Sequence, residues 1–180
     1  MDENCKIDKV SVRLVPDAPV YSDRPINNSK DAVDVIGKHI AELDREVVCV
    51  VNLKSNGIPI NFSIVSMGAV NYTLAHPREI LKTAFLSNAS SIILIHNHPS
   101  GDLKPSKYDC DITKKMVHIG EMVGIPVVDH VIVTSKGYFS FRDNTDLIKE
   151  SLGDKLGKVF ESEEYYTESK MIAFPKNRYR

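Results

Sequence analysis

The sequence predicts an α/β domain in which a mixed central β-sheet is flanked by helices. Two runs of mainly apolar, largely β-branched residues, 46–53 and 91–96, are typical of strands that are buried on both faces. Segments with the apolar spacing of helices precede the first run, separate the two runs and follow the second. The elements are justified below in chain order.

The N-terminal part predicts a tail, a strand, a loop and a helix. Residues 1–8 are polar, and we expect a flexible tail there. Residues 10–15 alternate as V-S-V-R-L-V, which predicts a strand, and the proline-containing segment 17–25 predicts a loop. Asn28 and Ser29 are candidate N-caps for a helix that runs to about Leu43 with its apolar residues on one face.

The middle of the chain predicts the centre of the sheet. The run 46–53 (E-V-V-C-V-V-N-L) fits a central strand, and residues 55–57 (S-N-G) form a turn signal after it. Residues 58–66 and 70–74 predict the next strands, with a break at Gly68. Pro77 suits the first position of a helix that continues to Leu86.

The second half predicts a strand, a long helix and a hairpin. Residues 91–96 (S-I-I-L-I-H) form the second buried strand, and Ser106 opens a helix that runs to about Val123 and stops at Gly124. Residues 127–134 and 138–141 predict strands around a turn at 136–137. The pattern weakens after this point, so we expect one domain over residues 9–142 and a partly ordered tail over 143–180.

Composition and charge exclude several classes of protein. The 23 basic and 24 acidic residues give a net charge of −1, which does not support nucleic-acid binding as a main role. Three cysteines without a C-x-x-C pair argue against a disulfide framework and a zinc ribbon. The sequence contains no run of about 18 apolar residues, so it predicts no membrane-spanning helix. We therefore expect a cytoplasmic protein with no membrane association, and the oligomeric state stays open.

A metal-site pattern follows the second buried strand. His96-Asn97-His98-Pro99 is followed, after six residues, by Ser106-Lys107-Tyr108-Asp109. Side chains two positions apart in an extended segment point the same way, so the two imidazoles face one side. Asp109 lies one turn into the predicted helix, where its carboxylate can face back toward the strand end. Two imidazoles and one carboxylate leave a fourth position of a tetrahedral zinc site open, as in catalytic zinc centres.

A catalytic zinc site also needs a proton acceptor and a donor for the oxyanion. Glu46 begins an otherwise apolar strand, which is an odd place for a carboxylate unless that end opens on a site. It is our candidate general acid/base. The Ser106 hydroxyl is the candidate donor to the oxyanion that forms on an attacked carbonyl.

Ordinary structural explanations exist for each of these residues. A lone H-x-H pair is a weak signal, and Ser106-x-x-Asp109 is also a capping-box pattern. Glu46 alone is more often a strand-end carboxylate. The combination of these residues favours a metal site, because five fixed positions recur by chance in only about 1 in 10,000 chains of this size.

The motif resembles that of a known family. H-x-H-P, six residues and S-x-x-D, with a glutamate about fifty residues upstream, is similar to the JAMM motif of MPN+ (JAB) metalloproteases. The longer run H-N-H-P-S-G-D, together with H-P-R-E at 76–79, P-S at 105–106 and D-H at 129–130, resembles the RadC-like branch. The resemblance covers about residues 44–141 and implies a single MPN/JAB-like (cytidine-deaminase-like) domain.

The resemblance also implies site roles. One zinc ion per chain would be held by His96, His98 and Asp109, with Glu46 as general acid/base and Ser106 as the oxyanion donor. RadC-like proteins often carry an N-terminal helix-hairpin-helix region; no such segment is visible here, so we do not expect autonomous DNA docking.

Several nearby residues have two explanations. Asp129 and His130 are neighbours in an apolar strand, so at most one points toward the site; His130 is either a contact behind a ligand or a satisfied core histidine. His118 and His39 are expected at the surface. Cys110 points about 100° away from Asp109 around the helix and is a poor ligand. Cys49 is expected in the core, and Arg78 and Lys104 are expected as solvated charges. Tyr108 either lines the cleft or only covers the loop.

Three functions were weighed against these residues. The leading hypothesis is a zinc-dependent metallopeptidase that cleaves an amide (peptide or isopeptide) bond of a protein or peptide substrate. The second is a non-catalytic MPN-like binding or scaffold module linked to DNA repair or mobile-element processes. The third, a zinc nucleobase deaminase, needs H-x-E and P-C-x-x-C ligands that the sequence lacks.

Overall fold

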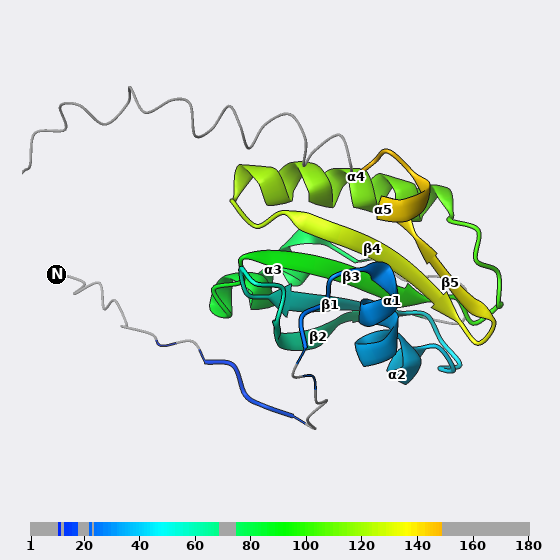
Figure 1. The fold of residues 1–180 in the computed structure, drawn as a ribbon, viewed down its shortest axis with the longest axis horizontal. Helices are drawn as coiled ribbons and strands as arrows, with labels where there is room; N and C mark the ends of the chain where they lie inside the picture. The colour runs from blue at the N-terminus through cyan, green and yellow to red at the C-terminus, as the bar shows by residue number, and fades with distance from the viewer. Residues whose placement is uncertain (1–10, 12, 18–21, 23, 69–74, 149–180) are drawn as a thin grey trace, which may run out of the picture.

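A mixed β-sheet forms the centre of the structure, a computed structural model that describes residues 11, 13–17, 22, 24–68 and 75–148. Within these residues the sheet has five strands in the order β2-β1-β3-β4-β5 (Figure 1). Only β3 and β4 run parallel; the other neighbours are antiparallel. The prediction of an α/β fold with a mixed sheet between helices is confirmed.

β1 (Val47–Leu53) is the central strand that the sequence predicted. All seven of its residues are buried, because it lies between β2 (Pro59–Met67) and β3 (Ser91–Asn97) and is covered on both faces. Its register with β3 places Val48 opposite His96. The start of β1 therefore lies beside the end of β3, and the residues that precede β1 lie next to those that follow β3.

An irregular helix covers one face of the sheet. It consists of α1 (Ser29–Ala32), the π-helical segment η1 (Val33–Gly37) and α2 (Lys38–Ile40), so it ends three residues before the predicted Leu43. Asn28 caps it by accepting a hydrogen bond from the Asp31 backbone N–H at 2.9 Å. Gly37 lets the helix approach the sheet closely, because a Cβ there would lie 3.0 Å from Val133 Cγ1.

Two longer helices cover the opposite face. α3 (Pro77–Leu86) precedes β3, and α4 (Lys107–Met122) connects β3 to the parallel strand β4 (Val127–Thr134) (Figure 1). β5 (Gly137–Ser140) then pairs with β4 as a hairpin, and the short helix α5 (Phe141–Asn144) follows. The predicted helices 77–86 and 106–123 are confirmed to within one residue at each end.

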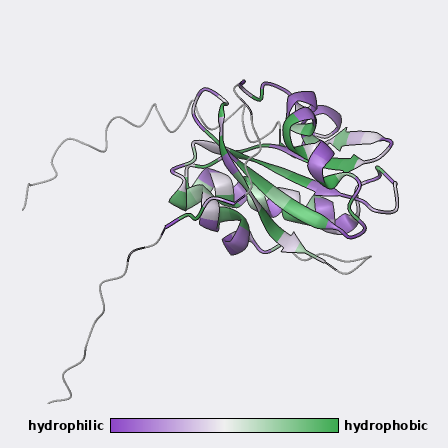
Figure 2. Ribbon diagram, turned by 90° about the horizontal axis from the view of Figure 1, so that it is seen from below, coloured by the Kyte–Doolittle hydropathy of each residue, from purple (hydrophilic) through white to green (hydrophobic). Residues whose placement is uncertain are grey.

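The core is divided by the sheet into two apolar clusters. Figure 2 shows the strands in hydrophobic colours between helices that are hydrophilic on their outer sides. The cluster under α3 and α4 includes Ile80, Leu94, Met116 and Phe141, while the cluster under the N-terminal helix includes Ile36, Cys49, Val51 and Val131. Alternate residues of β1 and β3 supply both clusters, as expected for strands that are buried on both faces.

Some predicted elements differ from the structure. Residues 11 and 13–15, the described part of the predicted strand 10–15, form no strand, because an alternating pattern makes a strand only where a neighbour supplies hydrogen bonds. Phe141 starts α5 instead of ending a strand, since the Ser140 hydroxyl accepts the Asp143 N–H at 3.1 Å and caps the helix. The predicted strand 70–74 lies outside the described residues.

Residues 143–148, which the sequence assigned to the C-terminal tail, pack against the domain. Ile148 is fully buried and belongs to the cluster under α3 and α4. Asp143 accepts a hydrogen bond from the Ser29 hydroxyl, which connects α5 to the N-terminal helix. Among the described residues, no helix combines the length and apolarity that crossing a membrane requires.

Candidate metal centre

His96 and His98 lie at the carboxyl end of β3 and face the same side of the sheet. The backbone N–H of His98 donates to Val133 O at 3.0 Å, so the extended chain continues one residue past the strand and keeps the alternation of side chains. The two Nε2 atoms are 3.0 Å apart. His96 is buried, with 1% of its surface exposed, whereas His98 is half-buried.

Asp109 joins the histidines from the first turn of α4. Its Oδ1 lies 3.3 Å from His96 Nε2, and its Oδ2 lies 3.6 Å from His98 Nε2. The same carboxylate completes a capping box: Oδ2 accepts the Ser106 N–H at 2.7 Å, and Ser106 Oγ accepts the Asp109 N–H at 3.1 Å. The capping and ligand interpretations of this motif are therefore compatible, because the cap holds the carboxylate against the histidines.

The donor set fits a small divalent cation. The two Nε2 atoms are 3.0 Å apart, Asp109 Oδ1 lies 3.3 Å from His96 Nε2, and Asp109 Oδ2 lies 3.6 Å from His98 Nε2. Zinc–ligand bonds of about 2.0–2.1 Å at tetrahedral angles place ligands about 3.3 Å apart, within the spread found here. Two imidazole nitrogens and a carboxylate oxygen are a typical zinc ligand set.

The outer nitrogen of His98 is fixed by the loop that follows it. Its Nδ1 lies 2.7 Å from the carbonyl oxygen of Asp102. A carbonyl can only accept, so Nδ1 carries the proton and the lone pair of Nε2 points toward His96 and Asp109. Gly101 shapes this loop with a φ of 76°, a conformation that favours glycine, and donates its N–H to His98 O at 3.0 Å.

The electrostatics of the cluster favour a positive charge between its members. Burial alone would raise the pKa of Asp109, but hydrogen bonds from His96 and His98 outweigh burial and hold that pKa well below its usual range. Burial would lower the pKa of His98, but hydrogen bonds to Asp109 and to the Asp102 carbonyl outweigh it and raise that pKa. The lowered pKa keeps the Asp109 carboxylate ionised, and a negative charge beside two imidazoles suits a metal cation.

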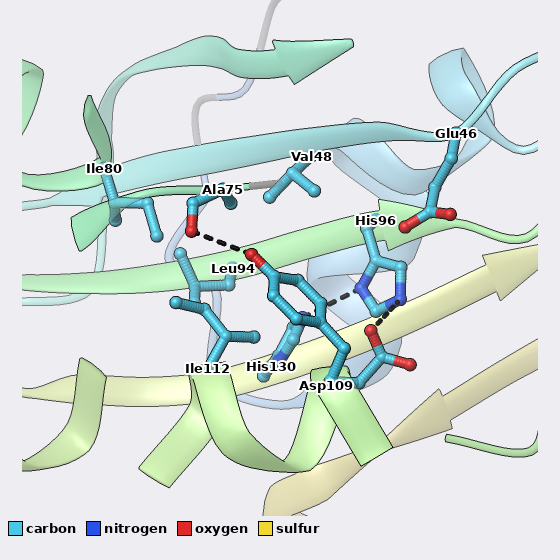
Figure 3. A pocket seen from close by; sticks show the side chains of 10 residues that line it. Glu46, Val48, Ala75, Ile80, Leu94, His96, Asp109, Ile112 and His130 are labelled. Carbon is cyan, nitrogen blue, oxygen red and sulfur yellow. Dashed lines mark hydrogen bonds and ion pairs between the residues drawn. The ribbon is translucent and has the colours of Figure 1, made fainter. Parts of the chain in front are cut away.

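Glu46 lies directly before β1 and lines a pocket that reaches the cluster. In Figure 3 its carboxylate, the His96 imidazole and the Asp109 carboxylate gather at one end of this pocket. The placement follows from register: Val48 pairs with His96, so Glu46, two residues earlier, faces the same side of the sheet. Burial raises the pKa of Glu46, while His96 and His98 oppose the shift.

Asn97 fixes the backbone on both sides of Glu46. Its Oδ1 accepts the Val47 N–H at 2.7 Å, and its Nδ2 donates to Arg45 O at 3.0 Å and to Leu43 O at 3.3 Å. The residue is fully buried. The middle residue of the H-N-H motif thus ties the turn that carries Glu46 to the strand that carries both histidines, a role that sequence reasoning missed.

The rest of the pocket is narrow and mostly apolar. Its volume is about 10 Å³, room for one water molecule, and its apolar walls come from Val48, Ala75, Ile80, Leu94 and Ile112. The Tyr108 hydroxyl donates to Ala75 O at 3.0 Å and so connects α4 to the residues that precede α3. Tyr108 lines the pocket, which is one of the two placements that the sequence left open.

Ser106 is exposed at the start of α4. Its oxygen accepts the Asp109 N–H, and its side chain is also one of the hydrogen-bond partners that lower the pKa of Asp109. Ser106 is the N-cap of the helix turn that carries the Asp109 carboxylate.

His130 contacts the site, and its neighbour Asp129 points away. His130 Nε2 lies 2.8 Å from His96 Nδ1, while Asp129 accepts hydrogen bonds from Ser140 Oγ and from the Arg142 N–H. Sequence reasoning had left His130 open and had missed Thr113, whose Oγ1 lies 2.6 Å from His130 Nδ1. Thr113 follows Asp109 by four residues and so lies on the same face of α4. This spacing was the feature of the sequence that could have identified Thr113.

The other singled-out residues lie where the sequence placed them. His39 and His118 are exposed, and Cys49 is buried in the core. Cys110 is half-buried and does not belong to the group of possible ligands, which among the described residues is His96, His98 and Asp109. Arg78 and Lys104 are exposed.

Comparison with known proteins places this geometry in a family. Residues 26–146 match the family model described as the RadC-like JAB domain. The chain belongs to the RadC-like JAB family. The matched range holds the whole candidate centre, from Glu46 through Asp109 to His130, as well as the sheet that positions it.

Many curated proteins are similar to this chain, and the names of the relatives given below state no activity. A UPF0758 protein of Thermotoga maritima is 45% identical over 105 residues, which cover 58% of this chain and 47% of the relative. UPF0758 proteins of Desulfitobacterium hafniense (40% over 121 residues; 67% and 53%) and Rubrobacter xylanophilus (38% over 136 residues; 76% and 57%) are similar to it as well. The chain spans about half the length of these relatives.

Proposed function

We propose that this RadC-like JAB protein is a zinc-dependent hydrolase of the JAMM type that cleaves an amide bond, peptide or isopeptide, in a protein or peptide substrate. One observation carries the proposal: the Nε2 atoms of His96 and His98 lie 3.0 Å apart, and each lies within 3.6 Å of a carboxylate oxygen of Asp109. The Glu46 carboxylate lies at the same end of the pocket as His96 and Asp109 (Figure 3). A cluster of this composition at the mouth of a pocket is the arrangement of a hydrolytic zinc centre.

Zinc would be held by His96 Nε2, His98 Nε2 and an Asp109 carboxylate oxygen. When bound, it would supply a Lewis acid that activates water and polarises the scissile carbonyl. The chain supports this with a buried carboxylate that is kept ionised and with a His98 imidazole whose outer proton is fixed on the Asp102 carbonyl. These features arrange the ligands before any ion arrives, which limits the cost of binding.

Glu46 would move the proton. Its carboxylate accepts a proton from the attacking water and passes that proton to the leaving amine nitrogen as the C–N bond breaks. Burial raises the pKa of Glu46, which makes the carboxylate a stronger base than an exposed glutamate. Asn97 holds the backbone on both sides of this residue, so the carboxylate meets the reacting atoms from a fixed direction.

Ser106 would stabilise the charge that develops on the carbonyl oxygen. Its hydroxyl oxygen accepts the Asp109 N–H, which fixes the side chain at the start of α4, and the hydroxyl proton would be donated to the oxyanion as it forms. The pocket beyond the cluster has room for about one water molecule, so the group that enters it beside the scissile bond must be small.

The test uses the zinc-loaded full chain with a mixture of linear and isopeptide-linked peptides, followed by mass spectrometry. Cleavage at defined amide bonds is expected for wild type. Glu46→Gln should bind zinc normally and lose activity by at least about 100-fold, because the proton acceptor is gone. Full turnover by Glu46→Gln rules out the mechanism, and no cleavage by zinc-loaded wild type favours the binding-module alternative.

A further inference from the structure

His96 has a close polar neighbour at both ring nitrogens. Nε2 faces His98 and Asp109, whereas Nδ1 lies 2.8 Å from Nε2 of His130. A neutral imidazole carries one proton, so it can present a lone pair to a metal at Nε2 only if that proton is on Nδ1. The partner of Nδ1 therefore decides whether His96 is ready to act as a ligand.

A series of hydrogen bonds that begins at a backbone carbonyl group determines which nitrogen of His130, and then of His96, carries the proton. Thr113 Oγ1 donates its single proton to the Asp109 backbone carbonyl at 2.5 Å. The same oxygen lies 2.6 Å from His130 Nδ1, and with its proton committed it can only accept, so His130 Nδ1 carries the hydrogen. His130 Nε2 is then an acceptor and receives the proton of His96 Nδ1.

The surroundings hold His130 in this orientation. Only 2% of its surface is exposed, and its ring stacks on Phe141 with centroids 4.9 Å apart and planes at 11°. Its backbone N–H donates to Asp129 at 2.7 Å. The ring cannot flip without breaking two hydrogen bonds inside the core, so its acceptor nitrogen stays directed at His96.

We propose that Thr113 and His130 are positioning residues that fix the tautomer of His96 and thereby set the affinity of the centre for zinc. This inference rests on the proposed zinc site and adds two residues that touch neither metal nor substrate. Thr113 lies on α4, one turn after Asp109, and donates a hydrogen bond to the Asp109 backbone carbonyl. It is therefore the first residue of the series and is also bonded directly to a proposed ligand residue. Both residues thus act on ligands through hydrogen bonds.

The tautomer can be measured without metal. Two-bond ¹H–¹⁵N correlation spectra of histidine-labelled protein distinguish Nδ1–H from Nε2–H rings. We expect His96 and His130 to be Nδ1–H tautomers in the metal-free wild type. Thr113→Val removes the acceptor of His130 Nδ1–H at nearly constant volume, so His130 and His96 should shift toward Nε2–H. Thr113→Ser keeps the hydroxyl and should retain the wild-type tautomers.

Zinc affinity supplies the second measurement, by competition with a chromophoric chelator. Thr113→Val should bind zinc about 10–100-fold more weakly, the usual effect of losing a hydrogen-bond partner behind a ligand, and Thr113→Ser should restore most of the loss. Thr83→Val is a matched control, because Thr83 also accepts a hydrogen bond, from Asn52 at 3.2 Å, but lies on α3 and outside this series. Circular dichroism confirms that each variant is folded.

The outcomes separate the inference from the proposed function. Wild-type affinity in folded Thr113→Val, or an Nε2–H tautomer of His96 in wild type, overturns the inference while the zinc site stands. Failure of wild type to bind zinc refutes the proposed function and the affinity part of the inference. The tautomers of wild type and Thr113→Val then still decide whether Thr113 and His130 position His96.

Discussion

Replacing Asn97 with alanine should destabilise the protein while leaving the ligand side chains in place. Asn97 is fully buried and makes three hydrogen bonds to the turn at 43–47. Leaving the buried Val47 N–H without an acceptor costs about 2 kcal/mol, and the bonds to two carbonyls in an exposed turn add about 0.5 kcal/mol each. The free energy of unfolding should therefore fall by about 3 kcal/mol.

Denaturant unfolding of metal-free protein measures this change. Asn56→Ala is the control, because Asn56 is exposed and accepts a single hydrogen bond of 3.2 Å, so its loss should stay below about 1 kcal/mol. Zinc content of Asn97→Ala should match wild type, whereas amide hydrolysis should fall because Glu46 is no longer held. An Asn97→Ala variant as stable as the control would refute the role of this amide.

Three further outcomes follow from the structure. Burial raises the pKa of Asp129 from its ordinary value of 3.8 to about 6, so ionising this carboxyl group destabilises the fold. The stability that is present below pH 3.8 is lost as the pH rises through 6. Urea unfolding should therefore favour Asp129→Asn over wild type by about 2 kcal/mol more at pH 7 than at pH 4, and a pH-independent difference would contradict this. Gly120→Ala should lower the melting temperature by several degrees, because the added Cβ would lie 2.6 Å from Ile125 O; an unchanged melting temperature would show that the chain relaxes there. The pKa of His98 is raised, so a proton on this imidazole competes with zinc. Chelator competition should show zinc affinity falling by up to about tenfold for each pH unit of acidification near neutrality. A constant affinity from pH 8 to 6 would contradict that competition.

Local patterns in the sequence were enough to predict the sheet centre and the ligand group. The apolar run of β1, the two-residue spacing of His96 and His98, and the one-turn offset of Asp109 from its cap each depend on neighbours in the chain. Backbone periodicity determines where such side chains point. The strand, the helix and the pairing of the two histidines were therefore predictable, and the family match agrees with them.

Contacts between distant segments could not be predicted in the same way. The bond from Asn97 to Val47 joins residues 50 positions apart, and that from Thr113 to His130 joins residues 17 apart. Both depend on which strands become neighbours, which periodicity does not state. Residues 11 and 13–15, the described part of the strand expected over 10–15, form no strand for the same reason, because an alternating pattern does not specify a partner strand. β5 ends at Ser140, one residue earlier than predicted, because the Ser140 side chain caps α5, and the strand pattern of the sequence does not indicate this cap.

Zinc content by elemental analysis tests the central claim most directly. Wild type, His98→Ala and Asp109→Ala are purified in parallel, supplied with zinc, desalted and checked for folding. About one zinc ion per wild-type chain, lost from both variants, is the expected result. A folded wild type without bound zinc, or variants that retain it in full, would contradict a metal centre built by His96, His98 and Asp109.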